Sequence, residues 1–228
     1  MEYTERHHAF ISASFYKKLK DYGEKGLAVF TLATQRYAEQ RGSRMAQKAI
    51  VLGMPLNFET YFALGEWNYT ESFLKSVSGE SSRVISYSPD YCLNVFVCPW
   101  NEQYKAMGLL DGGALYCKHL DVAISRGFNP YLDFRVTQTL HESDKCVFEL
   151  KDAYIEKTPE KLKEWTLPFE FHCAHVFHTF SEIIKSILKA EGTGISAAVL
   201  ADFSKEYGKE MADRLVSYED TNFNVICN

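Results

Sequence analysis

The sequence lacks the features that mark several classes of protein. It has no apolar run of roughly 18 residues, the length of a membrane helix, and charged residues stand near its N-terminus, where a secretory signal would be apolar. It also has no basic cluster, and its net charge is −5. We therefore expect a cytoplasmic protein whose partners include neither a membrane nor nucleic acid.

Cysteine is sparse, and its spacing excludes the common frameworks. The six cysteines form no CxxC pair and stand at Cys92, Cys98, Cys117, Cys146, Cys173 and Cys227. In a reducing compartment such cysteines are free thiols or metal ligands, not disulfides. We expect no cofactor, with zinc as the alternative that the cysteines leave open.

What is present fits a domain with a sizeable core. Apolar residues make up 46% of the chain and aromatic residues 14%, enough to fill a core or to line a pocket for a small ligand. Apolar periodicity and turn residues predict the elements. Helices are expected over 5–22, 27–52, 57–64, 99–108, 114–126, 172–188 and 194–218, and strands over 83–88, 92–97, 131–140 and 145–152.

This order predicts an α+β fold spanning residues 1–228 as one domain. Helices fill residues 1–75, the sheet and the site fill 83–153, and helices return in 170–220. We expect an antiparallel sheet of about four strands with two inserted helices, separated by Gly112-Gly113. Helical hairpins should flank it at the N- and C-terminal ends.

The apolar run that ends at Cys98 is the most informative stretch. It reads as a strand that passes directly into a helix beginning at Pro99, because proline favours the first helical position. Cys98 is then the N-cap residue, facing unpaired backbone N–H groups and the positive end of the helix dipole. Both favour a reactive thiolate. A small buried cysteine in a tight turn is the alternative.

Other reactive side chains stand in the same third of the chain. Cys117 and Asp121 are four residues apart on one predicted helix and so share a face, while Cys146 lies on a strand. His141 sits where one strand gives way to the next. His175 lies among three histidines spaced every three residues from 172 to 178. Burial in the core, or solvation for Asp121, would also explain each residue.

These residues carry a resemblance to a known family. Cys98-Pro-Trp100, Leu115-Tyr-Cys117 with Asp121, Gly127-Phe-Asn-Pro130, Thr137-Gln-Thr-Leu140 and Cys146-Val-Phe148 stand in an order and spacing similar to the L-2-amino-thiazoline-4-carboxylic acid hydrolase family. Arg41 to Ala46 and His172 to Phe180 resemble its flanking helices. The turn 142–144 is Glu-Ser-Asp, where members often carry glycine. The family is distantly similar to 4-vinyl-reductase-type domains, in which comparable cysteines can hold zinc.

The resemblance implies a hydrolase that opens a cyclic amidine or a related heterocycle. Cys98 would attack the carbon between nitrogen and sulfur, Asp121 would hold the protonated amidine, and His141 or His175 would move protons. The pocket would be lined by Cys117, Cys146, Trp100 and Thr139. The expected partner is a small-molecule substrate, and the sequence leaves a homodimer open.

The sequence leaves two other functions open. Three thiolates with a histidine or a carboxylate suit zinc, which would make the protein a zinc-dependent hydrolase, but the ligand spacings match no short zinc motif. Without a reactive centre, the protein would be a non-catalytic domain that binds a small ligand or zinc.

Overall fold

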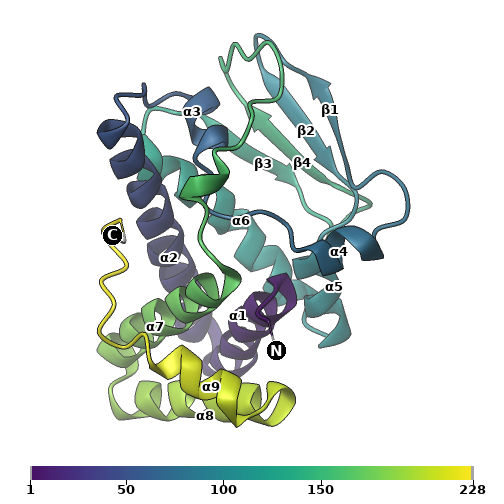
Figure 1. Ribbon diagram of the computed structural model, residues 1–228. Helices are drawn as coiled ribbons and strands as arrows, with labels where there is room; N and C mark the ends of the chain where they lie inside the picture. The colour runs from purple at the N-terminus through teal and green to yellow at the C-terminus, as the bar shows by residue number, and fades with distance from the viewer. Residues whose placement is uncertain (1, 227–228) are drawn as a thin grey trace.

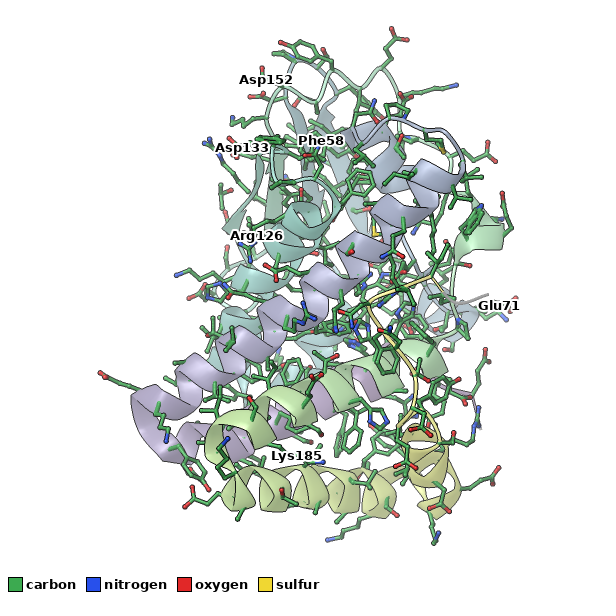
Figure 2. All side chains as sticks on the ribbon, turned by 90° about the vertical axis from the view of Figure 1, so that its left-hand side faces the viewer. Phe58, Glu71, Arg126, Asp133, Asp152 and Lys185 are labelled. Atoms are coloured by element: carbon green, nitrogen blue, oxygen red, sulfur yellow. The ribbon has the colours of Figure 1, made fainter. Side chains whose placement is uncertain are left out.

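An antiparallel sheet packs at one end of a set of helices, and the sheet and the last helices lie at opposite ends of the molecule (Figure 1). The computed structural model describes residues 2–226. Figure 2, turned by 90°, shows Asp133 and Asp152 at the sheet end and Lys185 toward the opposite end. The predicted α+β fold is confirmed.

The elements follow the predicted order. The helices are α1 (Glu5–Leu19), η1 (Lys20–Tyr22), α2 (Gly23–Val51), α3 (Phe58–Ala63), α4 (Glu71–Ser76), α5 (Pro99–Ala106), α6 (Leu110–Phe128), η2 (Lys163–Trp165), α7 (Phe169–Leu188), α8 (Ala190–Tyr207) and α9 (Lys209–Val216). The strands are β1 (Ser82–Ser86), β2 (Tyr91–Val95), β3 (Phe134–Gln138) and β4 (Cys146–Leu150). No helix among residues 2–226 is both long and apolar enough to span a membrane.

The sheet has the strand order β1-β2-β4-β3, with every neighbouring pair antiparallel. The hairpins β1–β2 and β3–β4 therefore meet through β2 and β4, where Val95 pairs with Cys146. The chain leaves β2 and enters α5 at Cys98, and it leaves β3 through the loop that carries His141. The segment with Cys98 and the loop with His141 thus leave the sheet at the same end of its strands.

The helix α6 connects this sheet to the helical layer, because it contacts β3, α5 and α2. Its crossing with α2 is unusually close. A Cβ on Gly42 would stand 2.0 Å from the carbonyl oxygen of Ile124, and one on Gly127 would stand 2.4 Å from that of Glu39. Only glycine allows the two backbones to approach so closely. The crossing fixes α2 and α6 relative to each other.

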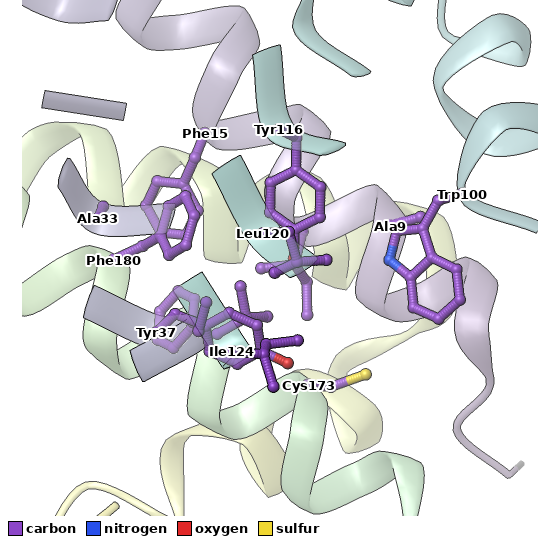
Figure 3. Close-up of a cluster of buried hydrophobic side chains, with 14 of the residues drawn as sticks. Ala9, Phe15, Ala33, Tyr37, Trp100, Tyr116, Leu120, Ile124, Cys173 and Phe180 are labelled. Carbon is purple, nitrogen blue, oxygen red and sulfur yellow. The ribbon is translucent and has the colours of Figure 1, made fainter. Parts of the chain in front are cut away.

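Aromatic side chains fill the core between α6 and the helical layer. Figure 3 shows Tyr116, Leu120 and Ile124 projecting from α6 into the cluster, with Trp100 on one side. Tyr116 is fully buried, and Leu120 and Ile124 are nearly so. Because this face of α6 is taken up by the core, the adjoining face, with Cys117 and Asp121, is the one available to the site.

Glycines account for two of the differences between the expected helices and the observed ones. Gly112 and Gly113 do not separate two helices but lie in the first turn of α6, where a Cβ on Gly112 would overlap the Tyr16 ring. The last predicted helix is interrupted at Gly208, whose φ of 94° ends α8 before α9 begins. The segment α4 was not expected, and Thr70 caps it by accepting a hydrogen bond from Phe73 N–H.

Candidate functional site

The loop between β3 and β4 holds His141 at the end of the sheet. The backbone N–H of Leu140 donates a hydrogen bond to Cys146 Sγ over 3.2 Å, which ties the loop to the first residue of β4. Cys146 is buried, and burial raises the pKa of its thiol, whereas the bond from Leu140 lowers it. Cys146 therefore positions the loop that carries the histidine.

His141 contacts a cysteine with one ring nitrogen and an amide with the other. Its Nε2 lies 3.3 Å from Cys117 Sγ on α6, and its Nδ1 lies 3.2 Å from Asn101 Nδ2 on α5. The ring rests on Gly113, one turn before Cys117 on the same face of α6. The structure thus brings together a thiol, an imidazole and an orienting amide, the arrangement by which a base activates a nucleophile.

Both groups of this pair are neutral in the resting protein. Burial lowers the pKa of His141 to about 4, so its imidazole is unprotonated at neutral pH and can accept a proton. Burial raises the pKa of Cys117 well above its ordinary value, and negative charge on Cys98, Asp121 or Cys146 raises it further. Cys117 therefore rests as a neutral thiol, with the unprotonated imidazole of His141 beside it.

Cys98 is the N-cap residue of α5, as predicted, with extended backbone angles and Pro99 behind it. The expectation of a low pKa is wrong. Burial raises the pKa of Cys98 to about 12, although backbone N–H groups of Asn101 and Trp100 lower it. Charge on Cys146 and Asp121 raises it as well. Desolvation outweighs the helix terminus here, because a thiolate loses more hydration energy than a few dipoles return.

Asp121 lies one turn beyond Cys117 and faces a cavity. Burial raises its pKa to about 6, and the positive charge of Arg41 on α2 lowers it. The cavity has a volume of about 170 Å³. Its walls come from α2, α3, α6 and the segments that follow α3 and β4: Arg41, Met45, Tyr61, Phe62, Gly65, Glu66, Trp67, Asp121, Ile124 and Lys161. The cavity is small, and charged side chains of both signs line it.

His175 is not among the residues gathered at Cys117. It is fully buried on α7, its Nε2 lies 2.9 Å from Gln40 Oε1, and its Nδ1 lies 3.3 Å from Arg44 Nη2. Its ring stacks on Phe223 with 4.6 Å between centroids. The structure gives this histidine a place in a buried polar network, where burial and Arg44 lower its pKa well below the ordinary value.

Trp100 and Thr139 flank the site and do not enter the cavity. Trp100 donates a hydrogen bond from Nε1 to His8 Nδ1 over 3.0 Å and stacks on Trp67, which does line the cavity. Thr139 is buried in the β3–β4 loop, and its hydroxyl donates to Glu142 over 3.4 Å. Trp100 thus packs against a side chain that lines the cavity, whereas Thr139 bonds within its own loop.

The cysteines among the described residues do not gather into a metal site. Across residues 2–226, no group of three or more His, Cys, Asp or Glu side chains is arranged to hold a metal ion. The described cysteines, Cys92, Cys98, Cys117, Cys146 and Cys173, are free thiols, one of the two expected states, and Cys227 lies outside the described residues. The donor set therefore does not fit the zinc alternative.

Sequence reasoning missed Asn101 and Arg41. Asn101 stands three residues after Cys98, so both face the start of α5, a spacing that could have pointed to it. Arg41 lies far upstream, in a segment that reads as an amphipathic helix. Its approach to Asp121 depends on the α2–α6 crossing, which no local pattern reveals.

Comparison with known proteins identifies the family to which the chain belongs. The family model for L-2-amino-thiazoline-4-carboxylic acid hydrolase matches residues 3–150, well over half of the chain and all of the segment from Arg41 to Cys146. Searches of the curated proteins and of the solved structures gave no significant match. By its name the family is one of hydrolases that act on an aminothiazoline carboxylate. The chain belongs to the L-2-amino-thiazoline-4-carboxylic acid hydrolase family.

Proposed function

We propose that the protein is a cysteine hydrolase that opens a cyclic amidine of the 2-aminothiazoline type. The observation that carries the proposal is the chain Cys117–His141–Asn101, with 3.3 Å and 3.2 Å between successive side chains, one helical turn from Asp121. It provides a nucleophile, a base and an orienting group beside a carboxylate. This assigns the attack to Cys117 rather than to Cys98.

Ring opening follows from these positions. The Cys117 sulfur bonds to the carbon between nitrogen and sulfur as its proton passes to His141 Nε2. The bond from that carbon to the ring sulfur then breaks, and the imidazolium returns the proton to the departing thiolate. The product is an isothiourea joined to Cys117, with the ring opened to a free thiol.

Water completes the reaction. It adds to the isothiourea carbon as His141 removes one of its protons, the carbon–sulfur bond to Cys117 breaks, and the proton returns to that sulfur. The product is an N-carbamoyl amino acid that carries a thiol. One water is consumed, and Cys117 and His141 regain their starting states.

Asn101 and Asp121 support these steps. For Nε2 to accept a proton, Nδ1 must carry the hydrogen and donate it to the oxygen of the Asn101 amide, whose oxygen and nitrogen exchange by a half-turn of the side chain. Asp121, ionised above its pKa of about 6, pairs with the protonated amidine and makes its carbon more electrophilic. Cys98 lines the site at the start of α5.

The test is turnover by the purified full-length protein. We expect 2-amino-thiazoline-4-carboxylate to release one thiol per molecule opened, with N-carbamoylcysteine identified by mass spectrometry. Cys117→Ala should lower kcat by at least about a thousandfold. Cys98→Ala should lower it by less than about tenfold, because its role is to line the site. Loss of turnover in Cys98→Ala with retention in Cys117→Ala would instead assign the attack to Cys98.

A further inference from the structure

The helix α2 carries three buried cations, one turn apart, around a single carboxylate. Arg44 donates to both oxygens of Glu66, from Nε over 3.0 Å and from Nη2 over 2.6 Å, and Lys48 donates to Oε1 over 3.1 Å. Burial alone would raise the pKa of Glu66, but Arg44 and Lys48 outweigh it and lower that pKa to about 2. Two of the three cations thus donate hydrogen bonds to Glu66.

Arg41, the third cation, is not satisfied in this way. Its side chain is 4% exposed, and its guanidinium lies over the Trp67 ring, 3.7 Å from the centroid. Its Nε is 3.8 Å from Glu66 Oε2, too far for a hydrogen bond. Nε and Nη1 have no hydrogen-bond partner among the described residues. A buried guanidinium left in this state is costly, and it borders the cavity described above.

A second cation reaches the same cavity from the connector after β4. Lys161 Nζ donates to the carbonyl oxygen of Trp67 over 2.5 Å, and burial, with the charge of Arg41, lowers its pKa to about 8. Arg41, Lys161 and the two cations paired with Glu66 bring four positive charges to this region. Glu66 and Asp121 bring two negative ones. Since Arg44 and Lys48 already neutralise Glu66 from outside the cavity, Arg41 and Lys161 face it with only Asp121 as a further carboxylate. An anion in the cavity would neutralise the remaining positive charge.

We propose that the cavity holds the carboxylate of the substrate between Arg41 and Lys161. The inference rests on the proposed function, which places the reacting carbon at Cys117 and the amidine at Asp121. The aminothiazoline carboxylate of the family name carries both groups, an amidine and a carboxylate, on one small ring, and the inference assigns the residues that hold the carboxylate. A volume of about 170 Å³ lies below the range of roughly 300–1,000 Å³ typical of drug-sized ligands, and so favours such a compact molecule.

Binding can be measured apart from turnover in Cys117→Ala protein. Isothermal calorimetry would compare 2-amino-thiazoline-4-carboxylate with 2-aminothiazoline, which differs by the absence of the carboxylate. We expect the carboxylate to bind at least about tenfold more tightly, since it forms charge-assisted hydrogen bonds with Arg41. Adding Arg41→Met should abolish this preference, and Lys161→Met should reduce it severalfold.

The matched control is Arg126→Met, because Arg126 is an arginine paired with Glu39 at the surface of α6. It should leave both affinities unchanged. Equal affinity for the two rings in the parent protein would overturn the inference, as would a preference that survives both Arg41→Met and Lys161→Met. If Arg41→Met does not fold, the inference is tested with Lys161→Met alone. Lys161 lies on a connector outside the helices and strands, so we expect this variant to fold.

The two proposals fail in different ways. In one outcome, the ring with a carboxylate binds more tightly, with the preference lost in Arg41→Met, while the protein with Cys117 unchanged opens no cyclic amidine. That result would support the anion site and contradict the hydrolase proposal. If the ring is opened with equal efficiency whether or not it bears a carboxylate, the hydrolase stands and the anion site falls.

Discussion

The imidazole of His141 lies on Gly113, so closely that a Cβ at that glycine would stand 2.2 Å from its Cε1 and 2.3 Å from its Nδ1. The absence of a side chain at residue 113 thus determines where the imidazole of His141, the proposed base, lies. Cys117 follows one turn later on the same face of α6, so the glycine and the thiol together define the contact that the histidine makes.

Gly113→Ala should therefore reduce activity without loosening the helix. Alanine favours a helix over glycine by about 1 kcal/mol, but its methyl group displaces the imidazole from Cys117. We expect kcat to fall by about a hundredfold, the order of loss that a shift of roughly 1 Å can cause. The control is Gly194→Ala, which meets open space in α8 and should leave kcat unchanged. An unchanged kcat in Gly113→Ala would show that His141 is not the base.

Asn101→Ala tests whether the amide orients the base. Without it, His141 keeps its contact with Cys117 but loses the group that fixes its tautomer, so kcat should fall about ten- to a hundredfold with little change in KM. Asn101→Asp, which still accepts from Nδ1, should recover part of the loss. Lys105→Ala, on the exposed side of α5, is the control for changes in that helix. If Asn101 had only a structural role, Asn101→Ala would instead lower the thermal midpoint and raise KM.

The pH dependence of kcat/KM should follow the ionisation of the Asp121 carboxyl group. Because its pKa is raised to about 6, kcat/KM should rise as pH increases through 6 and then level off, as the carboxylate that binds the amidinium becomes ionised. Asp121→Asn should remove this rise and most of the turnover. A profile that is flat between pH 5 and 7 in the unaltered protein would separate Asp121 from substrate binding.

The raised pKa of Asp121 also predicts that Asp121→Asn stabilises the folded protein. A carboxyl group whose pKa is higher in the folded protein than in the unfolded chain destabilises the fold once pH exceeds the unfolded value, about 3.9, with the full effect above pH 6. Asp121→Asn should therefore raise Tm at pH 8 more than at pH 4. Thermal denaturation at the two pH values measures the difference.

Alkylation should find no strongly acidic thiol. Burial raises the pKa values of Cys98 and Cys117, so iodoacetamide should modify either only slowly at pH 7 and faster as pH rises above about 9. Mass spectrometry of digests from each pH assigns the sites. A cysteine that reacts rapidly with an apparent pKa below 7 would indicate a thiolate–imidazolium pair and contradict the neutral pair inferred here.

Glu66→Gln should destabilise the fold, because it leaves Arg44 and Lys48 buried without their anion. Breaking such a buried network typically costs about 3–5 kcal/mol. Glu71→Gln removes the exposed pair with Lys75 and should change stability by less than about 0.5 kcal/mol. Denaturant unfolding of both variants provides the comparison, and equal stabilities would show that Glu66 is dispensable.

Local sequence patterns predicted the elements well because their signals are short-range. Pro99 after an apolar run predicted where α5 begins, and alternation predicted β3 and β4. Gly112-Gly113 was expected to separate two helices, since glycine usually weakens a helix, but both residues lie inside α6. Here their lack of side chains admits Tyr16 and His141, and that contact is visible only in the folded protein.

The site was predicted only in part, for a similar reason. Cys98, Cys117, Asp121, Cys146 and His141 were all selected, yet the attack was assigned to Cys98 on the basis of the helix terminus. Desolvation, which depends on the surrounding chain, reverses that argument. The choice of Cys117 required the contact between α6 and the β3–β4 loop, two segments with no sequence signal that joins them.

The glycine contacts between α2 and α6 also bear on how ligand preference can change. Arg41 precedes Gly42, and Asp121 lies one turn before the backbone that Gly42 contacts. The close crossing therefore fixes the position of Arg41 on α2 relative to Asp121 on α6. Lys161, by contrast, comes from a connector beyond the residues that the family model matches. Engineering for rings of other sizes should therefore begin in that connector, because exchanging it leaves the spacing between Arg41 and Asp121 intact.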